Sequence, residues 1–481
     1  MIKMVLRGVL VLVAIVCVVI LMMGLMSRRL PDLKLWHRVV LQEEFRAKNA
    51  PPGMTFDDYL TREQQVFDEL DAKVYQQMPP EEQLPYNRFY HKSYSFPDNF
   101  ARNWNRSFEL IPTSPIRGGV LMLHGLTDSP YSNHALAQVL YEHGYYVLGL
   151  RYPGHGTIPS GMMQCSWEDW EAAAKMALEH VRKKIGDARP LYLCGYSTGG
   201  SLALKMTFDA LSEQRKTADK VFLFSPAIEV SPFGVLADWY KPIGWLPFFE
   251  KSPWKDVNPE YDPFKYNSFA NHAGGEVYKL ANIVQGQVED LRKKGLLAQA
   301  PPIIAFQSVV DTTVVGSALV KKLYGKLEPN NSKLVIFDVN HDPQVEPFIK
   351  TPYKSVFSQF EAYEQPLPFE LTIVTNATTQ TPEVVAETRK AGEKTFQKTP
   401  LSMSWPSQVY SLSHVSLLFP PDDPLYGGIE TRALPASFKI GTLTPKGELS
   451  VLNVSIQQLM RLRYNPFFDY LTQQVLTEMQ K

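Results

Sequence analysis

The fold is decided by the stretch Leu191-Tyr192-Leu193-Cys194-Gly195-Tyr196-Ser197-Thr198-Gly199-Gly200-Ser201-Leu202-Ala203-Leu204. An apolar strand runs into Gly-x-Ser-x-Gly, and small residues then open an apolar helix. A turn this sharp strains the backbone of the serine and requires small neighbours, because strand and helix approach closely. It lifts the Ser197 hydroxyl above the carboxyl edge of a sheet, beside the positive end of a helix. Ser197 is therefore the candidate nucleophile, and the alternative interpretation is a purely structural turn.

Apolar runs and amphipathic helical stretches alternate on both sides of this turn. The runs are Gly119–Leu123, Tyr145–Leu150, Leu191–Cys194, Val221–Phe224, Ile303–Gln307 and Leu334–Val339, and the intervening helices include Ser132–His143 and Trp167–Lys184. Such alternation indicates parallel strands joined by crossover helices. The predicted fold class is α/β, with a doubly wound, mostly parallel sheet.

A second polar turn follows the first of these strands, at His124-Gly125-Leu126-Thr127. In this architecture the backbone N–H of Leu126 and that of Thr198, directly after the nucleophile, would together hold the oxyanion of a tetrahedral intermediate. His124 precedes the nucleophile in the chain. We therefore interpret it as a residue that shapes the loop.

Four motifs, in this order and spacing, resemble the carboxylesterase and monoacylglycerol-lipase branch of the α/β-hydrolase superfamily. They are His124-Gly125-Leu126-Thr127, Arg151-Tyr152-Pro153-Gly154-His155-Gly156-Thr157, Trp167-Glu168-Asp169-Trp170 and Gly195-Tyr196-Ser197-Thr198-Gly199. The resemblance covers roughly residues 107–345. It implies a sheet with a cap, ester hydrolysis through an acyl-enzyme and no cofactor. It also implies that His155 organises its loop.

A catalytic acid and a histidine should follow Ser197 in chain order. Asp311 follows the apolar strand Ile303–Gln307 in an Asp-x-x-Val setting, which is where the resembling branch carries its acid. Asp311 would orient the imidazole and stabilise the imidazolium. A solvated loop aspartate is the alternative.

Two histidines follow Asp311. His341 comes just after the strand Leu334–Val339, at the family's usual distance from the acid, whereas His414 ends a second candidate strand, Val409–Ser413. The prolines and aspartates of residues 419–427 would fix the loop after His414, which a base in register requires. We favour His414 as the base. His341 stays as the alternative, because His414 implies an insertion over residues 342–405. That insertion would contain a strand, Phe369–Thr375, and a helix, Pro382–Lys394.

The predicted organisation has six parts. They are a membrane anchor (1–29), a helical stalk or linker (30–106), the first part of the hydrolase core (107–225), an aromatic-rich cap (226–300), the second part of the core (301–430) and a C-terminal extension (431–481). The stalk assignment depends on Val66, Phe67, Leu70 and Val74, which lie at helical spacing.

Composition excludes several classes of protein. The 49 basic and 49 acidic side chains cancel, so no electrostatic reason exists to expect a nucleic-acid partner. The three cysteines cannot build a disulfide framework. We find no metal-ligand spacing and no Gly-rich phosphate loop, so neither a metal nor another cofactor is expected.

The N-terminus predicts a membrane anchor. Nineteen residues from Gly8 to Met26 lack a charge, and as a helix they would span roughly 28 Å, about the thickness of a bilayer core. A signal peptide would have a shorter apolar core and a small-x-small cleavage site, and this run ends in a poor one. We therefore favour an uncleaved anchor over a cleaved signal peptide. Basic residues flank it on both sides, so the side of the membrane that carries the catalytic domain stays open.

These features predict a membrane-anchored serine hydrolase that cleaves a carboxylic ester with an apolar or lipid-like part. An acyltransferase using the same three residues is one alternative, and a catalytically inactive, membrane-tethered scaffold is another. The sequence leaves open the ester, its acyl-chain length and the oligomeric state.

Overall fold

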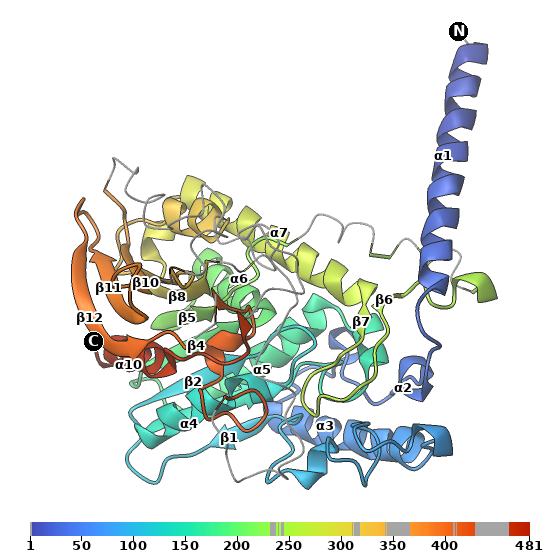
Figure 1. Cartoon of the computed structure of the whole chain (residues 1–481), viewed down its shortest axis with the longest axis horizontal. Coiled ribbons are helices and arrows are strands. Elements are labelled where there is room, and N and C mark those ends of the chain that lie inside the picture. The colour runs from blue at the N-terminus through green and yellow to red at the C-terminus, as the bar shows by residue number, and fades with distance from the viewer. Residues whose placement is uncertain are drawn as a thin grey trace.

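The computed structural model describes residues 2–230, 237–238, 240–241, 245–309, 311, 318–341, 343, 366–406, 409, 411–428 and 461–481. The chain folds around a ten-stranded sheet in the order β1-β3-β2-β4-β5-β8-β9-β10-β11-β12. The central strands from β3 to β10 pair in parallel, and antiparallel pairings occur only at the edges of this sheet. The predicted α/β fold with a mostly parallel sheet is confirmed (Figure 1).

Each strand predicted in the core is present. The strands of the sheet are β1 (Phe108–Leu110), β2 (Gly118–Leu123), β3 (Tyr145–Leu150), β4 (Leu191–Tyr196), β5 (Lys220–Phe224), β8 (Ile303–Ser308), β9 (Lys333–Phe337), β10 (Glu370–Asn376), β11 (Glu383–Arg389) and β12 (Gln397–Ser404). Strands β2, β3, β4 and β8 are buried along their whole length. Their near-continuous apolar sequence follows from helices covering both faces of the sheet.

Helices pack on both faces. The principal helices are α3 (Phe56–Leu70), α4 (His134–Glu142), α5 (Trp167–Ile185), α6 (Thr198–Ser212), α7 (Asn271–Lys293) and α10 (Phe468–Gln480). Helices α5, α6 and α7 share one apolar core with the sheet, and α4 and α10 share the other. The carboxyl ends of the parallel strands are left at one edge, where ligands bind in such sheets.

The segment predicted as a stalk is packed against the body. Helix α3 forms where helical spacing indicated one, and Thr55 caps it by accepting the backbone N–H of Asp58. Phe56 and Tyr59 join the core beneath α5, and Phe67 is buried as well. The prediction that residues 30–106 form a stalk or linker is therefore wrong for α3, because the apolar stripe of this helix packs against the core instead of facing water.

The insertion also differs from the prediction. The predicted strand Phe369–Thr375 is β10, but Pro382–Lys394, predicted as a helix, contains β11 instead. Val384 and Val385 are β-branched and fit a pleated surface, and β11 pairs antiparallel with β10. Residues 342 and 344–365 of this insertion lie outside the described residues.

The region predicted as the cap has two parts. Its described residues include the strands β6 (Trp254–Asp256) and β7 (Phe269–Ala270), which form a separate two-stranded sheet. Helix α7 instead carries the chain from β5 to β8, with Leu280 and Val284 in the core. Helix α7 therefore belongs to the core and not to the predicted cap 226–300. Two of the aromatic residues of the predicted cap, Phe233 and Trp239, lie outside the described residues.

The C-terminal residues are not an appendage. Strand β14 (Arg461–Leu462) pairs with β13 (Ser411–Leu412), just before His414. Helix α10 closes one face of the sheet, where the Tyr192 hydroxyl donates a 2.9 Å hydrogen bond to the Met479 carbonyl. Residues 429–460 of the predicted extension lie outside the described residues.

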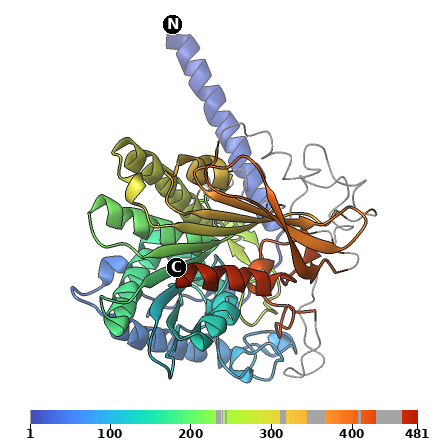
Figure 2. The same cartoon turned by 90° about the vertical axis from the view of Figure 1, so that its left-hand side faces the viewer.

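Helix α1 (Ile2–Arg28) stands away from the body in both views (Figures 1 and 2). Across the described part of the chain, no helix reaches the length and apolarity of a membrane span. The predicted transmembrane helix is not confirmed.

Candidate active site

Ser197 lies at the sharp turn between β4 and α6. Its backbone has φ 52° and ψ −115°, a left-handed conformation that costs a non-glycine residue free energy and is characteristic of functional sites. Thr198 is the first residue of α6, so its N–H has no acceptor within the helix. The turn therefore presents both the hydroxyl and a helix N-terminus at the carboxyl edge of the sheet.

Two glycines allow this turn. A Cβ on Gly195 would strike the backbone of Gly199, and a Cβ on Gly199 would strike the carbonyl of Leu123 in β2. Small residues are therefore required around the serine, as predicted, because the backbones approach each other closely here.

His414 lies between Ser197 and Asp311. Its Nδ1 is 2.6 Å from Asp311 Oδ2, and its Nε2 is 3.1 Å from Ser197 Oγ. The Asp311 side chain is fully buried, whereas that of His414 is 13% exposed. With the Nδ1 proton donated to Asp311, Nε2 is left to accept the hydroxyl proton of Ser197.

His341 occupies a different environment. Its Nε2 lies 3.1 Å from Asp338 Oδ2, and its backbone N–H donates a 2.8 Å hydrogen bond to Asn376 Oδ1. Thr375 also donates to the Asp338 carboxylate. The structure thus places His414 between Asp311 and Ser197. His341 contacts a different carboxylate, that of Asp338, at the end of β9.

Gln307 is a site residue that the sequence reasoning missed. Its Nε2 donates a 2.8 Å hydrogen bond to Asp311 Oδ2, the same oxygen that meets His414. Gln307 is 2% exposed, at the end of β8. A polar side chain closing an otherwise apolar strand was the available signal.

Leu126 lies on the loop after β2. Lys265 and Tyr266, from the region predicted as the cap, contact this loop. The N–H of Tyr266 donates a 2.8 Å hydrogen bond to the carbonyl of Thr127, and Lys265 pairs with the Asp128 carboxylate. Thr127 has a positive φ of 65°, so the contacts from Lys265 and Tyr266 stabilise a strained loop.

The two motif histidines shape loops. His124 Nε2 accepts a 3.2 Å hydrogen bond from the N–H of Tyr152, and burial lowers the pKa of His124 well below its usual value. Burial likewise lowers the pKa of His155 to about 4. Both rings are neutral at pH 7, as loop-shaping residues can be.

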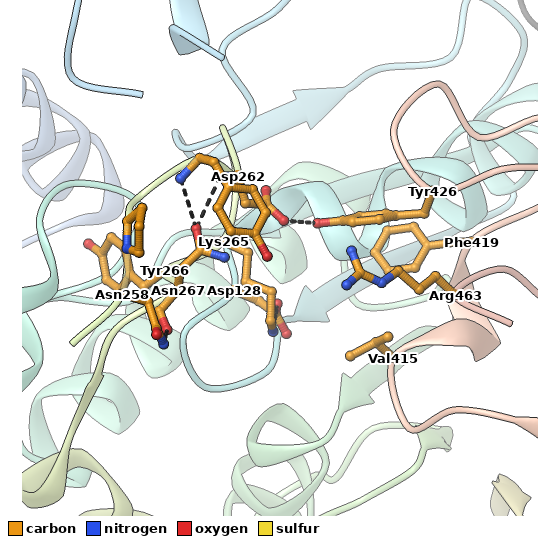
Figure 3. Close-up of a pocket in the computed structure, with 12 residues that line it drawn as sticks. Asp128, Asn258, Asp262, Lys265, Tyr266, Asn267, Val415, Phe419, Tyr426 and Arg463 are labelled. Carbon is orange, nitrogen blue, oxygen red and sulfur yellow. Dashed lines mark hydrogen bonds and ion pairs between the residues drawn. The ribbon is translucent and has the colours of Figure 1, made fainter. Parts of the chain in front are cut away.

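A cavity of about 370 Å³ opens beside this site. Val415, next to His414, lines one side together with Phe419, Tyr426 and Arg463, and Asp128 and cap residues line the other (Figure 3). The buried Asp262 accepts a hydrogen bond from the Tyr426 hydroxyl across the cavity wall. Charged and aromatic groups together suit a ligand that has both polar and apolar parts. In the described chain, no group of three or more His, Cys, Asp or Glu side chains could hold a metal ion.

Residues 114–337 match the model of the family described as serine aminopeptidase, S33. The thermostable monoacylglycerol lipase of Bacillus sp. (strain H-257) is 33% identical over 86 residues, which are 18% of this chain and 33% of that protein. The chain therefore spans about a third of the length of this curated relative.

Solved structures also resemble the chain. One comes from work on LipS and LipT, two metagenome-derived lipolytic enzymes, with 20% identity, TM-score 0.38 and coverage of 49% of this chain and 88% of that one. Another is the Paleococcus ferrophilus monoacylglycerol lipase, with 18% identity, TM-score 0.36 and coverage of 48% and 87%. The resemblance to the esterase and monoacylglycerol-lipase branch, inferred from four motifs, is confirmed by the family model and the curated relative.

Proposed function

We propose that this relative of the esterase and monoacylglycerol-lipase branch hydrolyses a carboxylic ester through an acyl-enzyme on Ser197. The observation that carries the proposal is the hydrogen-bonded chain from Asp311 through His414 to Ser197. A nucleophile, a base in contact with it and a group that orients the base are the minimum that acyl transfer requires.

His414 takes the proton of the Ser197 hydroxyl through Nε2 as Oγ attacks the ester carbonyl. The resulting imidazolium is stabilised by Asp311, and His414 returns the proton to the leaving alcohol as the carbon–oxygen bond breaks. Water then attacks the acyl-enzyme by the same route and releases the acid.

The backbone N–H groups of Leu126 and Thr198 stabilise the tetrahedral oxyanion. The position of Thr198 at the start of α6 supports this role, because the helix N-terminus carries partial positive charge and unpaired N–H groups. One such donor contributes about 2.7–4 kcal/mol to transition-state stabilisation.

The substrate is an ester with one polar and one apolar part. The cavity beside His414 supports this, since its lining combines Phe419 and Val415 with the charged side chains of Asp128, Lys265 and Arg463. A lipid-like ester with a polar alcohol has that character.

Helix α1 anchors the enzyme to a membrane as a single N-terminal segment. Support comes from the eleven large apolar side chains that are exposed on the described part of α1, each between 46% and 65%. A contiguous exposed apolar surface of this kind is a membrane or protein interaction site in folded proteins. Sedimentation with liposomes that resists high salt, and is lost when residues 1–29 are removed, tests the anchor.

A fluorophosphonate probe, which labels activated serines, tests the chemistry. We expect labelling of the wild type, and its loss in Ser197→Ala and His414→Ala. His341→Ala is the matched control, because His341 also faces a carboxylate, and it should keep labelling. Loss in His341→Ala and retention in His414→Ala would make His341 the base, and a folded wild type that does not label would favour an inactive scaffold. Products formed with and without a competing alcohol distinguish hydrolysis from acyl transfer.

A further inference from the structure

The end of helix α1 nearest the body is fastened to the cap. Gly24 faces the two rings of the short helix Pro247–Phe249, and a Cβ at that position would lie 2.7 Å from Phe248 and 2.5 Å from Phe249. A larger residue there would require these rings to shift. The apolar residues of α1 therefore lie directly beside this turn of the cap.

Polar contacts lock the same junction. The Ser27 and Ser252 hydroxyls are 3.1 Å apart, and Lys251 Nζ donates a 2.9 Å hydrogen bond to the carbonyl of Leu30. The Arg28 guanidinium lies 5.2 Å from the centre of the Phe248 ring. Apolar, hydrogen-bonding and cation–π contacts all join the two elements. These contacts fix the position of α1 relative to residues 245–252.

This contact sets how far α1 can enter a lipid phase. The uncharged helix residues before Gly24, Gly8–Met23, amount to roughly 24 Å at 1.5 Å per residue. A bilayer's hydrocarbon core is about 30 Å thick, so the uncharged part of α1 before Gly24 would enter the core without crossing it. The cap turn would then lie at the level where hydrocarbon gives way to headgroups.

Residues at that level have the composition of a membrane interface. Trp245, at the start of the turn, is 79% exposed, and Arg28 and Arg29 are exposed at the base of the helix. Tryptophan prefers the headgroup level, and arginine reaches toward phosphates from the end of an apolar helix.

We propose that α1 and the cap segment 245–252 form one continuous lipid-binding surface, with Trp245 lodged among the headgroups of a bilayer. The occupant is a lipid membrane, and the proposal rests on the anchoring part of the proposed function. It adds that the cap, which lines the cavity beside His414, is itself held on the membrane surface.

Cysteine labelling tests the proposal in the full chain. Cys17 is exposed on α1, while Cys165 and Cys194 are buried, so an environment-sensitive fluorophore on the wild type reports the helix. In a Cys17→Ser background, Trp245→Cys reports the cap turn. Ile111→Cys is the matched control, because Ile111 is an exposed apolar residue at 55%, directly after β1, which lies at the bottom of the view in Figure 1, away from α1. Each labelled protein is reconstituted in phosphatidylcholine vesicles that contain lipids with quenchers at shallow or deep positions, and thermal unfolding checks its fold.

We expect deep quenching of the label at Cys17, and shallow quenching at position 245 that exceeds that at position 111 by about twofold or more. Equal, weak quenching at 245 and 111, with Cys17 quenched, would overturn the proposal and leave the anchor standing. An unquenched label at Cys17 would overturn the anchor itself. Hydrolysis of a soluble ester is unaffected in either case, so the chemistry of Ser197 is judged separately.

Discussion

His414 lies 2.6 Å from Asp311, although 103 positions separate them in the chain. Strand β13, which ends two residues before His414, pairs with β14 near the C-terminus. The Ser413 hydroxyl donates a 2.7 Å hydrogen bond to the carbonyl of Leu462. The histidine is therefore held by a strand that lies outside the main sheet. Residues near the C-terminus determine its position.

Replacing Asp311 by asparagine should remove most of the activity. The amide cannot stabilise the imidazolium and favours the wrong tautomer of His414, so kcat for a soluble ester should fall by about 10³–10⁴-fold. Asp338→Asn, which alters the partner of His341, should keep activity within about tenfold. Steady-state kinetics of the two variants check this, and equal losses would contradict the proposed roles.

Gly199→Ala should destabilise the fold. Its Cβ would strike the carbonyls of Leu123 and His124 in the backbone, which cannot move like a side chain, so unfolding free energy should fall by about 2 kcal/mol or more. Gly286→Ala is the control, because this position in α7 has open space. Alanine there should be neutral or stabilise by about 0.5–1 kcal/mol. Urea unfolding measures both, and similar values would refute the steric argument.

Arg151→Leu should unfold much of the body. Arg151 pairs with Glu44 at 2.9 Å and with Glu63 at 3.0 Å, and all three side chains are buried. Removing the guanidinium leaves two buried carboxylates without this positively charged partner, which should lower the free energy of unfolding by about 3–5 kcal/mol. The exposed pair of Arg292 and Glu289 provides the control, since Arg292→Leu should change stability by less than about 1 kcal/mol. A small effect of Arg151→Leu would mean that residues 30–106 are not integral to the body.

Stability should decline in acid partly through His37. Burial, followed by Lys34 and Arg38, lowers the pKa of His37 from 6.5 to about 3. Between these two values the unfolded chain binds a proton that the folded protein does not, so stability present above pH 6.5 is lost as the pH falls toward 3. For this one proton the slope approaches about 1.4 kcal/mol per pH unit between the two pKa values.

The variant His37→Asn, which does not titrate, should flatten this dependence. His37 Nε2 lies 3.0 Å from the Ser268 hydroxyl, so the variant also loses some stability at pH 7. Urea unfolding at pH 7, 6 and 5 separates the two effects. Parallel curves for variant and wild type would show that His37 does not contribute to the acid slope.

The sequence by itself determined the sheet and the turn at its centre. Apolar runs such as Tyr145–Leu150 encode buried parallel strands, and Gly195 and Gly199 mark a turn that larger residues could not make. These signals are local, since periodicity and steric size act between neighbours in the chain. The proposed oxyanion role of Leu126 rests on the same kind of signal.

Only the tertiary structure decided which histidine meets Asp311, whether residues 30–106 stand free, and that Pro382–Lys394 contains strand β11 instead of a helix. His341 and His414 each follow a strand, and each lies against a carboxylate, so their local sequences do not separate them. Helix α3 has the same apolar stripe whether it is solvated or packed, and Val384 and Val385 become a strand because β10 offers an edge. In each case the outcome depends on surface supplied by residues distant in the chain, which local pattern does not record.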